Sequence, residues 1–266
     1  MRMRTLFIAL LALAAGGAQA AQCSARSPAK TTALVELYTS EGCDSCPPAD
    51  RWLSSLGAKG YTPDRVVPIA LHVDYWDYIG WKDPYARQAF SARQRKMAAL
   101  ARAAFVYTPQ VLLQGQDFRG WRDGSSPGTA FARQVARLNA RPARARIALA
   151  LDTGHKDAIE ADATAELLEG TAPADLALYL GAYENKLVSE VRAGENRGRT
   201  LQHDYVVLQW AGPFEFKGPR LTEHQRLPLL PKAVPANSGV VAFVQDRSTG
   251  EVLQALMLPA CPGKNP

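Results

Sequence analysis

Two cysteines separated by two residues, Cys43 and Cys46, constrain the fold of this chain more than any other feature. They follow an apolar run at residues 33–38 that is typical of a buried strand, and they precede a helix-like stretch at residues 48–57. At a strand-to-helix turn, backbone N–H groups of the helix start lower the pKa of the first thiol and favour a thiolate. We therefore predict that Cys43 is a catalytic nucleophile and that Cys46 resolves the mixed disulfide.

The N-terminal segment indicates export. Arg2 and Arg4 precede a short apolar run at residues 6–15, and an Ala-x-Ala cleavage site follows at residues 18–20. We predict a signal peptide over residues 1–20 and a periplasmic or secreted mature protein. No later apolar run approaches the length of about 18 residues that a membrane span needs, so no transmembrane segment is expected after cleavage.

Export also decides how the four cysteines are interpreted. In an oxidising compartment cysteines are normally paired, and four of them allow three pairings. If Cys43 pairs with Cys46, then Cys23 and Cys261 remain, one near each end of the mature chain. We predict a structural disulfide between Cys23 and Cys261, with two free thiols as the alternative.

The chain is predicted to form two domains with different patterns of secondary structure. Residues 30–140 alternate short apolar runs with helix-like stretches, which is typical of an α/β domain. Residues 145–262 contain short alternating runs separated by turn residues, which is typical of an all-β, immunoglobulin-like sandwich. The expected fold class is therefore an α/β domain followed by a β-sandwich.

The charge distribution argues against a nucleic-acid partner. The chain carries 31 Lys and Arg against 25 Asp and Glu, a formal net charge of +6. Its arginines are spread along the chain, whereas nucleic-acid readers concentrate basic residues in one stripe of a recognisable fold. We expect no nucleic acid among the partners.

Several motifs, read together with the cysteine pair, resemble a known family. They are CDSCPPAD at residues 43–50, HVDYWDY at 72–78, GWKDP at 80–84, YTPQ at 107–110 and GENRGRTLQH at 194–203. Together they are similar to the bacterial secreted proteins of domain-of-unknown-function family 1223. That family is thioredoxin-like, so the resemblance implies a thioredoxin-like domain at residues 30–140 and a redox pair. It implies no substrate.

The resemblance also implies where a substrate binds. In thioredoxin-like folds a Thr-Pro just before a strand carries a cis-proline whose loop faces the disulfide, and here Thr108 and Pro109 precede an apolar run. We expect Thr108, Pro109 and the adjacent Tyr107 to contact substrate. Trp76 is a fourth candidate, and anchoring a long loop in the core is its alternative role.

Departures from ordinary thioredoxins bear on the direction of electron flow. A carboxylate at Asp44 would raise the pKa of Cys43. Pro47 and Pro48 lack N–H groups, so the helix is expected to begin after the cysteine pair rather than through it. No histidine lies between the cysteines to make the pair a strong oxidant. These features favour a reductase or an isomerase-like couple.

His72, at the end of a predicted strand, opens a metal-binding alternative. Together with Cys43 and Cys46 it offers ligands for copper(I) or zinc. No second C-x-x-C or histidine pair completes a metal signature, so we expect no cofactor apart from the redox disulfide. His203 is expected to order a strand connection within the sandwich.

These observations predict an exported thiol–disulfide oxidoreductase, reductase or isomerase-like, acting on protein or small thiol substrates with an unidentified redox partner. Two alternatives stay open. In the first, Cys43–Cys46 is a permanent structural disulfide of a non-catalytic binding module. In the second, the two cysteines handle copper.

Overall fold

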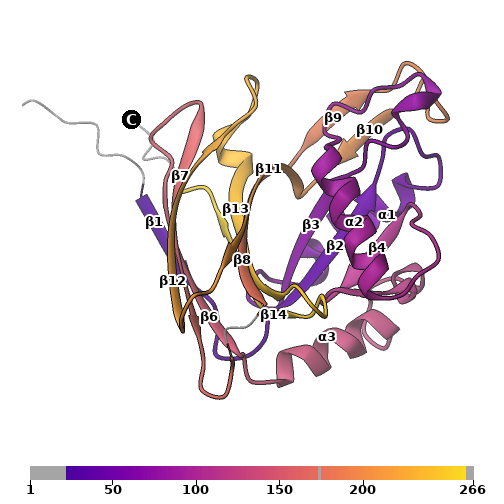
Figure 1. Cartoon of the computed structure of the whole chain (residues 1–266). Coiled ribbons are helices and arrows are strands. Elements are labelled where there is room, and N and C mark those ends of the chain that lie inside the picture. The colour runs from indigo at the N-terminus through magenta and orange to yellow at the C-terminus, as the bar shows by residue number, and fades with distance from the viewer. Residues whose placement is uncertain (1–21, 173–174, 262–266) are drawn as a thin grey trace, which may run out of the picture.

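The computed structural model describes residues 22–172 and 175–261. Its largest sheet comprises β2 (Ala33–Thr39), β3 (Val66–His72), β4 (Gln110–Leu113), β5 (Gln116–Asp117), β8 (Leu176–Glu184), β11 (Val206–Glu215), β13 (Ser238–Asp246) and β14 (Val252–Pro259). The strand order is β14-β13-β8-β11-β3-β2-β4-β5 (Figure 1). Its helices are α1 (Pro47–Ser54), α2 (Gln88–Leu100) and α3 (Ala130–Ala140), with short 3₁₀ turns at Gly57–Lys59, Asp77–Ile79, Arg119–Asp123 and Pro235–Asn237. The predicted signal peptide, residues 1–20, lies outside the described residues.

Strand β2 is buried along its whole length because helices cover both faces of the sheet around it. Ala33 and Leu37 pack with residues of α1 and α3 on one face. The alternate residues Leu34 and Tyr38 pack with residues of α2 on the other face. A strand with two covered faces gives a continuous apolar run instead of an alternating one, which explains why the sequence predicts this strand well.

Residues up to 140, which we call the first half, and residues from 145 onward, which we call the second half, both contribute strands to the eight-stranded sheet. Strand β3 pairs in parallel with β2 on one side and with β11 on the other, where Val206 lies opposite Ala70. The Ala70 N–H donates to the Tyr205 carbonyl at 2.8 Å. Strand β11 pairs with β8, and β8 pairs with β13, both antiparallel. Strands from the second half thereby extend the sheet that the first half begins.

The predicted fold class, an α/β thioredoxin-like domain followed by an all-β immunoglobulin-like sandwich, is wrong. The described residues contain fourteen β-strands against three α-helices, and they form several sheets, one of which crosses the predicted boundary between residues 140 and 145. The physical reason is that an apolar run identifies a buried strand but not its hydrogen-bond partner. The long-range pairing of β3 with β11 is therefore absent from local sequence patterns.

A second sheet packs against the end of the first one (Figure 1). It is antiparallel, with the order β1-β6-β7-β12, and consists of β1 (Gln22–Arg26), β6 (Ala145–Asp152), β7 (Ala158–Leu167) and β12 (Arg220–Pro228). Ile147 and Leu149 of β6 share a core with Leu178 of β8 and Val240 of β13. Alternate residues of β6 face outward, so this sheet is buried on one face only.

The ends of the described chain are joined covalently. Cys23 in β1 forms a disulfide with Cys261, just after β14, with a Cα–Cα distance of 5.5 Å and a sequence separation of 238. This is the pair that the sequence leaves over once Cys43 and Cys46 are paired.

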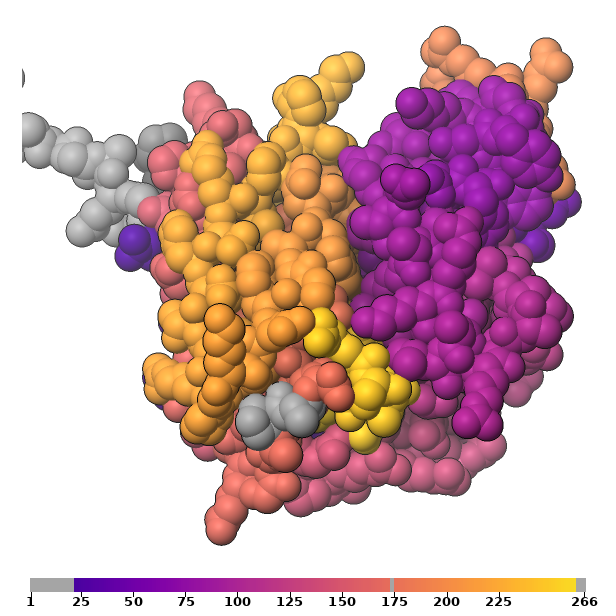
Figure 2. Space-filling view, viewed as in Figure 1, coloured from indigo at the N-terminus to yellow at the C-terminus, as the bar shows by residue number. Residues whose placement is uncertain are grey.

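A buried arginine binds helix α2 to the second half of the chain. Arg93 Nε lies 2.7 Å from Glu36 Oε2 of β2. Its guanidinium also lies 5.1–5.3 Å from the ring centres of three aromatic residues of β8, β11 and β13, namely Tyr179, Trp210 and Phe243. The space-filling view shows the purple first half in direct contact with the orange and yellow second half (Figure 2).

Within the described residues, no helix is both long enough and apolar enough to span a membrane.

Candidate functional site

The cysteine pair forms a disulfide at the turn between β2 and α1. The Cys46 N–H donates to the Cys43 carbonyl at 3.3 Å, which closes the turn. Helix α1 begins at Pro47 with Cys46 as its N-cap, so the helix starts after the pair, as the two prolines predict. Cys43 is 1% exposed and Cys46 is fully buried.

A hairpin from the second half of the chain covers this turn. It consists of β9 (Leu187–Glu190), the loop 191–199 and β10 (Thr200–His203), and we call it the β9–β10 hairpin. The side-chain amide of Asn196 donates to the carbonyls of Glu41 and Cys43, each at 2.8 Å. The Asp44 N–H donates to Glu195 Oε2 at 3.0 Å. The backbone on both sides of Cys43 is therefore fixed from outside the turn.

Five ionisable side chains are buried beside the disulfide turn, and we call them the buried cluster. All five are at most 5% exposed: Glu41, Asp50, His72, Asp83 and His203. The members come from the turn itself, from α1, from the end of β3, from the loop after β3 and from the end of β10. The two imidazole rings lie edge to face with their centres 4.9 Å apart.

Within the buried cluster each histidine faces one carboxylate. His72 Nδ1 lies 2.7 Å from Asp83 Oδ2, and His203 Nε2 lies 3.2 Å from Glu41 Oε1. The Glu41 N–H also donates to Asp83, which links the two pairs. Burial alone would raise the pKa of Asp83, but His72 holds it below its usual value. Burial opposes a charged His72, yet Asp83 raises the pKa of His72 above its usual value. Both shifts favour the charged forms, so the pair is an ion pair between the ordinary pKa values of the two groups, about 4 and 6.5.

Asp50 follows Cys46 by four residues, in the first turn of α1. Its N–H donates to the Cys46 carbonyl at 3.1 Å, one helical turn away. One carboxylate oxygen accepts a hydrogen bond from Thr39 at 3.2 Å, and the other has no partner among the described residues. Burial raises the pKa of Asp50 above its usual value. Asp50 and His203 also line a cavity of about 170 Å³ beside Pro47.

Two of the predicted substrate contacts, Trp76 and Thr108, are connected to the turn. Trp76 Nε1 donates to Thr108 Oγ1 at 2.8 Å. A Cβ atom on Gly42 would lie 3.1 Å from the Trp76 Cβ, so Trp76 packs closely on the residue before Cys43. The Thr108–Pro109 peptide bond is cis. Trp76 thus connects the Thr108 loop to the disulfide turn.

A groove that includes Tyr107, another predicted substrate contact, runs along the end of α2. It has a volume of about 290 Å³ and is lined by Tyr107 together with apolar residues that include Met97 and Leu112. Phe105, at its edge, is 68% exposed. Tyr78, on the loop that carries Trp76, is 83% exposed. Exposed aromatic side chains therefore accompany two of the loops next to the turn.

The metal-binding alternative for Cys43, Cys46 and His72 finds no geometric support. Among the described residues, no three His, Cys, Asp or Glu side chains are grouped so that they could hold a metal ion. Both sulfurs are engaged in the disulfide, and His72 Nδ1 is engaged by Asp83.

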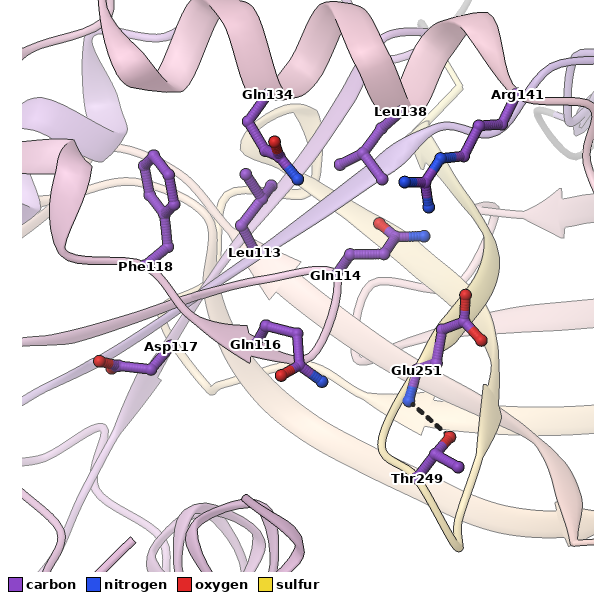
Figure 3. A pocket seen from close by; sticks show the side chains of 10 residues that line it. All are labelled: Leu113, Gln114, Gln116, Asp117, Phe118, Gln134, Leu138, Arg141, Thr249 and Glu251. Atoms are coloured by element: carbon purple, nitrogen blue, oxygen red, sulfur yellow. Dashed lines mark hydrogen bonds between the residues drawn. The ribbon is translucent and has the colours of Figure 1, made fainter. Parts of the chain in front are cut away.

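A larger cleft lies elsewhere, between α3 and the turn that joins β13 to β14 (Figure 3). Its volume is about 490 Å³, and none of the predicted site residues lines it. Arg141 and Glu251 point into it (Figure 3). Glu251 already pairs with Arg144 at 2.6 Å. We therefore place the candidate site at the disulfide turn, where ionisable groups are buried together.

Sequence reasoning missed Glu41, Asp50, Asp83 and Asn196 and misplaced His203, which contacts the disulfide turn instead of ordering a sandwich connection. One signal was available for part of this set. Strands β2 and β3 are parallel, and polar residues at the carboxyl ends of neighbouring parallel strands meet at one sheet edge, where ligands bind in open α/β sheets. Asn196 lies within the family-like motif at residues 194–203, but that motif does not indicate that Asn196 meets the turn at Cys43, 153 residues away.

Fold and site together define a class of protein in which the two halves share one mixed sheet and meet over a buried disulfide turn. The chain belongs to the family described as "Protein of unknown function (DUF1223)", which matches residues 34–245.

Two solved structures are similar to it. A protein from Agrobacterium tumefaciens, known from an X-ray crystal structure, is 23% identical with a TM-score of 0.60, covering 90% of this chain and 99% of that chain. HBP35 of Porphyromonas gingivalis is 17% identical with a TM-score of 0.62, covering 90% of this chain and 79% of that one. At these identities the similarity shows a common fold. No curated protein matches the chain.

Proposed function

We propose that this protein carries out thiol–disulfide exchange at the Cys43–Cys46 pair. The observation that carries the proposal is the buried cluster beside the turn. Burying ionised groups costs several kcal/mol each, by order of magnitude, unless they are well paired. Such groups with perturbed pKa values concentrate at functional sites. A disulfide that only held a turn together would need none of them.

The reaction is written with a substrate dithiol as the reductant. A first substrate thiolate attacks Cys43 Sγ, the Cys43–Cys46 bond breaks, and Cys46 leaves as a thiolate. The second substrate thiolate attacks the substrate sulfur of the mixed disulfide and releases Cys43. Two electrons and two protons pass from substrate to protein. In the reverse direction, Cys43 attacks a substrate disulfide and Cys46 resolves the mixed disulfide.

The surroundings of the turn favour a polypeptide as the substrate. The groove lined by Tyr107, the residue before Thr108, offers an apolar surface for a substrate side chain. Phe105 and Tyr78 add exposed aromatic surface, and aromatic residues are enriched at protein interfaces. We propose that Thr108, Pro109, Tyr107 and Trp76 line the path of an extended substrate. A separate redox partner would restore the starting state of the pair.

We further propose that the protein works outside the cytoplasm. Disulfides persist in oxidising compartments, and the described residues contain two. The basic and apolar pattern of residues 1–20 adds the features of a signal peptide.

The burial of both cysteines favours a second candidate function. Cys43 is 1% exposed and Cys46 is fully buried, so no sulfur is open to attack without movement of the covering residues. In this candidate the disulfide is permanent and the protein is a non-catalytic binding module.

The reduction potential of the Cys43–Cys46 pair separates the two candidates. It is measured by thiol trapping and mass spectrometry of the mature protein across a dithiol redox series. Exchange predicts a potential between about −270 and −120 mV, the span of known exchange proteins, whereas a permanent disulfide predicts a value below about −300 mV. Exchange also predicts that Cys46→Ser accumulates mixed disulfides with added protein substrates and that Cys43→Ser does not. Absence of adducts on Cys46→Ser would count against exchange.

A further inference from the structure

The hydrogen bonds of Asn196 point to a role beyond holding a loop. Asn196 is fully buried, and both of its amide protons are used, on the carbonyls of Glu41 and Cys43. Its side-chain oxygen accepts a hydrogen bond from Arg199 Nη1 at 2.8 Å. With donors and acceptor all matched, the orientation of the amide is fixed by its neighbours.

The β9–β10 hairpin that presents Asn196 has a rigid shape of its own. Val191 and Arg199 are joined by a backbone hydrogen bond of 3.0 Å, and the Gly198 N–H donates to the Val191 carbonyl at 2.8 Å. Gly194 has a φ of +73°, and a Cβ there would lie 3.0 Å from Ile79. The position therefore requires glycine, and the hairpin fits closely against the loop after β3.

The Cys43 carbonyl is the point at which this hairpin acts on the disulfide. It accepts from the Asn196 amide at 2.8 Å and from the Cys46 N–H at 3.3 Å. Neither hydrogen bond involves a sulfur atom, so neither depends on the S–S bond. When the disulfide opens, the backbone between the two cysteines stays tied, and the two thiols stay close together.

We propose that Asn196 is a positioning residue that sets the reduction potential of the Cys43–Cys46 pair. This inference rests on the proposed exchange function and deepens it. Asn196 keeps the reduced turn in the geometry that it has in the disulfide. The backbone therefore gains less conformational freedom when the disulfide is reduced. A restricted dithiol closes again more readily, as intramolecular reactions do when their groups are held in place. Asn196 thereby makes the pair a stronger reductant.

The test compares Asn196→Ala with a matched control. Gln254 is also fully buried and also donates to two carbonyls, those of Pro28 at 3.0 Å and Lys30 at 3.1 Å, away from the disulfide turn. Both variants lose a buried side-chain amide that clamps two carbonyls. Only the loss of Asn196 is expected to change the potential. Asn196→Leu, which is of similar size, removes both donors and adds no charge, serves if Asn196→Ala does not fold.

The readout is the equilibrium of the pair with a reference dithiol, measured on folded protein. We expect Asn196→Ala to shift this equilibrium about tenfold toward the reduced form, which corresponds to about 30 mV for a two-electron couple, and Gln254→Ala to leave it unchanged. An unchanged Asn196→Ala equilibrium, or an equal shift in both variants, would overturn the inference. A wild-type potential below about −300 mV would instead overturn the exchange function itself.

Discussion

The two disulfides of this protein lie in very different surroundings. Cys23–Cys261 joins residues 238 apart in sequence, and its sulfurs lie near backbone carbonyls, with Cys261 Sγ 3.6 Å from the Leu151 carbonyl. Cys43–Cys46 joins residues three apart and has the buried cluster beside it. Both have the same Cα–Cα distance of 5.5 Å. The contrast therefore lies in chain topology and electrostatics rather than in local spacing.

Under the proposed exchange function, the contrast assigns stability and chemistry to different disulfides. A cross-link stabilises a fold mainly by restricting the unfolded chain, and the restriction grows with the length of the closed loop. The bond at the chain ends therefore has a large effect on folding. The bond at the turn closes a short loop and therefore has a small effect on folding. It lies beside the titratable side chains of the buried cluster.

The largest effect is expected from removing the bond at the chain ends. In the double variant Cys23→Ala/Cys261→Ala, the unfolded chain is no longer restricted by a cross-link between residues 238 apart in sequence. The chain-entropy relation predicts a loss of about 5 kcal/mol in the free energy of unfolding. Denaturant unfolding of both proteins measures it, and a loss below about 1 kcal/mol would remove the stabilising role assigned to this bond.

The next largest effect is expected from Asp83→Asn, which leaves His72 without its buried partner. Removing one member of a buried ion pair costs about 3–5 kcal/mol, because the other charge stays buried and unpaired. The control is Glu251→Gln, since Glu251 pairs with Arg144 at 2.6 Å while both side chains are about half exposed. That exposed pair should contribute at most about 1 kcal/mol. Equal losses in the free energy of unfolding of the two variants would show that the buried pair stabilises the fold no more than the exposed pair.

The Asp83→Asn effect should depend on pH in a defined way. The pKa of His72 is raised in the folded state, so its contribution is full below its unfolded pKa of about 6.5 and is lost as pH rises through the folded value. The pKa of Asp83 is lowered, so its contribution is full above its unfolded pKa of about 3.9 and is lost as pH falls through the folded value. Unfolding measured between pH 3 and 9 should therefore show the largest difference from wild type at about pH 4 to 6.5.

The smallest effect is expected from removing the bond at the turn. The double variant Cys43→Ala/Cys46→Ala opens a loop with a sequence separation of three, and the same relation predicts a loss of about 2 kcal/mol. The turn also keeps the hydrogen bond that the Asn196 amide donates to the Cys43 carbonyl and the one that the Asp44 N–H donates to Glu195, and neither involves a sulfur. Unfolding under the same conditions as for the chain-end variant gives the ratio of the two losses. A loss as large as that of the chain-end variant would assign the turn disulfide a structural role.

Local elements of the first half were predictable because their signals are local. The apolar run at residues 33–38 becomes β2, and the expected helix at residues 48–57 becomes α1, shortened at its end. Pro47 and Pro48 fix the helix start because proline suits the first turn and lacks the N–H that a helix interior requires. The disulfide turn was placed correctly between these elements.

What the sequence did not reveal depends on contacts between distant segments. The pairing of β11 with β3 decides the fold class, yet each strand alone is only an apolar run. Asp50 and Glu41 read as ordinary polar residues until His72 and His203 are brought beside them from other elements. Asn196 belongs to a turn whose sequence predicts its shape but not the carbonyls that it meets.

The bond between Cys23 and Cys261 makes the chain between them a covalent ring. A protease that cuts one peptide bond anywhere in that ring adds a water molecule but releases no fragment. The nicked protein keeps a single mass and migrates as one species until a reductant separates the two pieces. Integrity of the backbone and integrity of the molecule are therefore distinct properties of this protein, and electrophoresis with and without reductant distinguishes them.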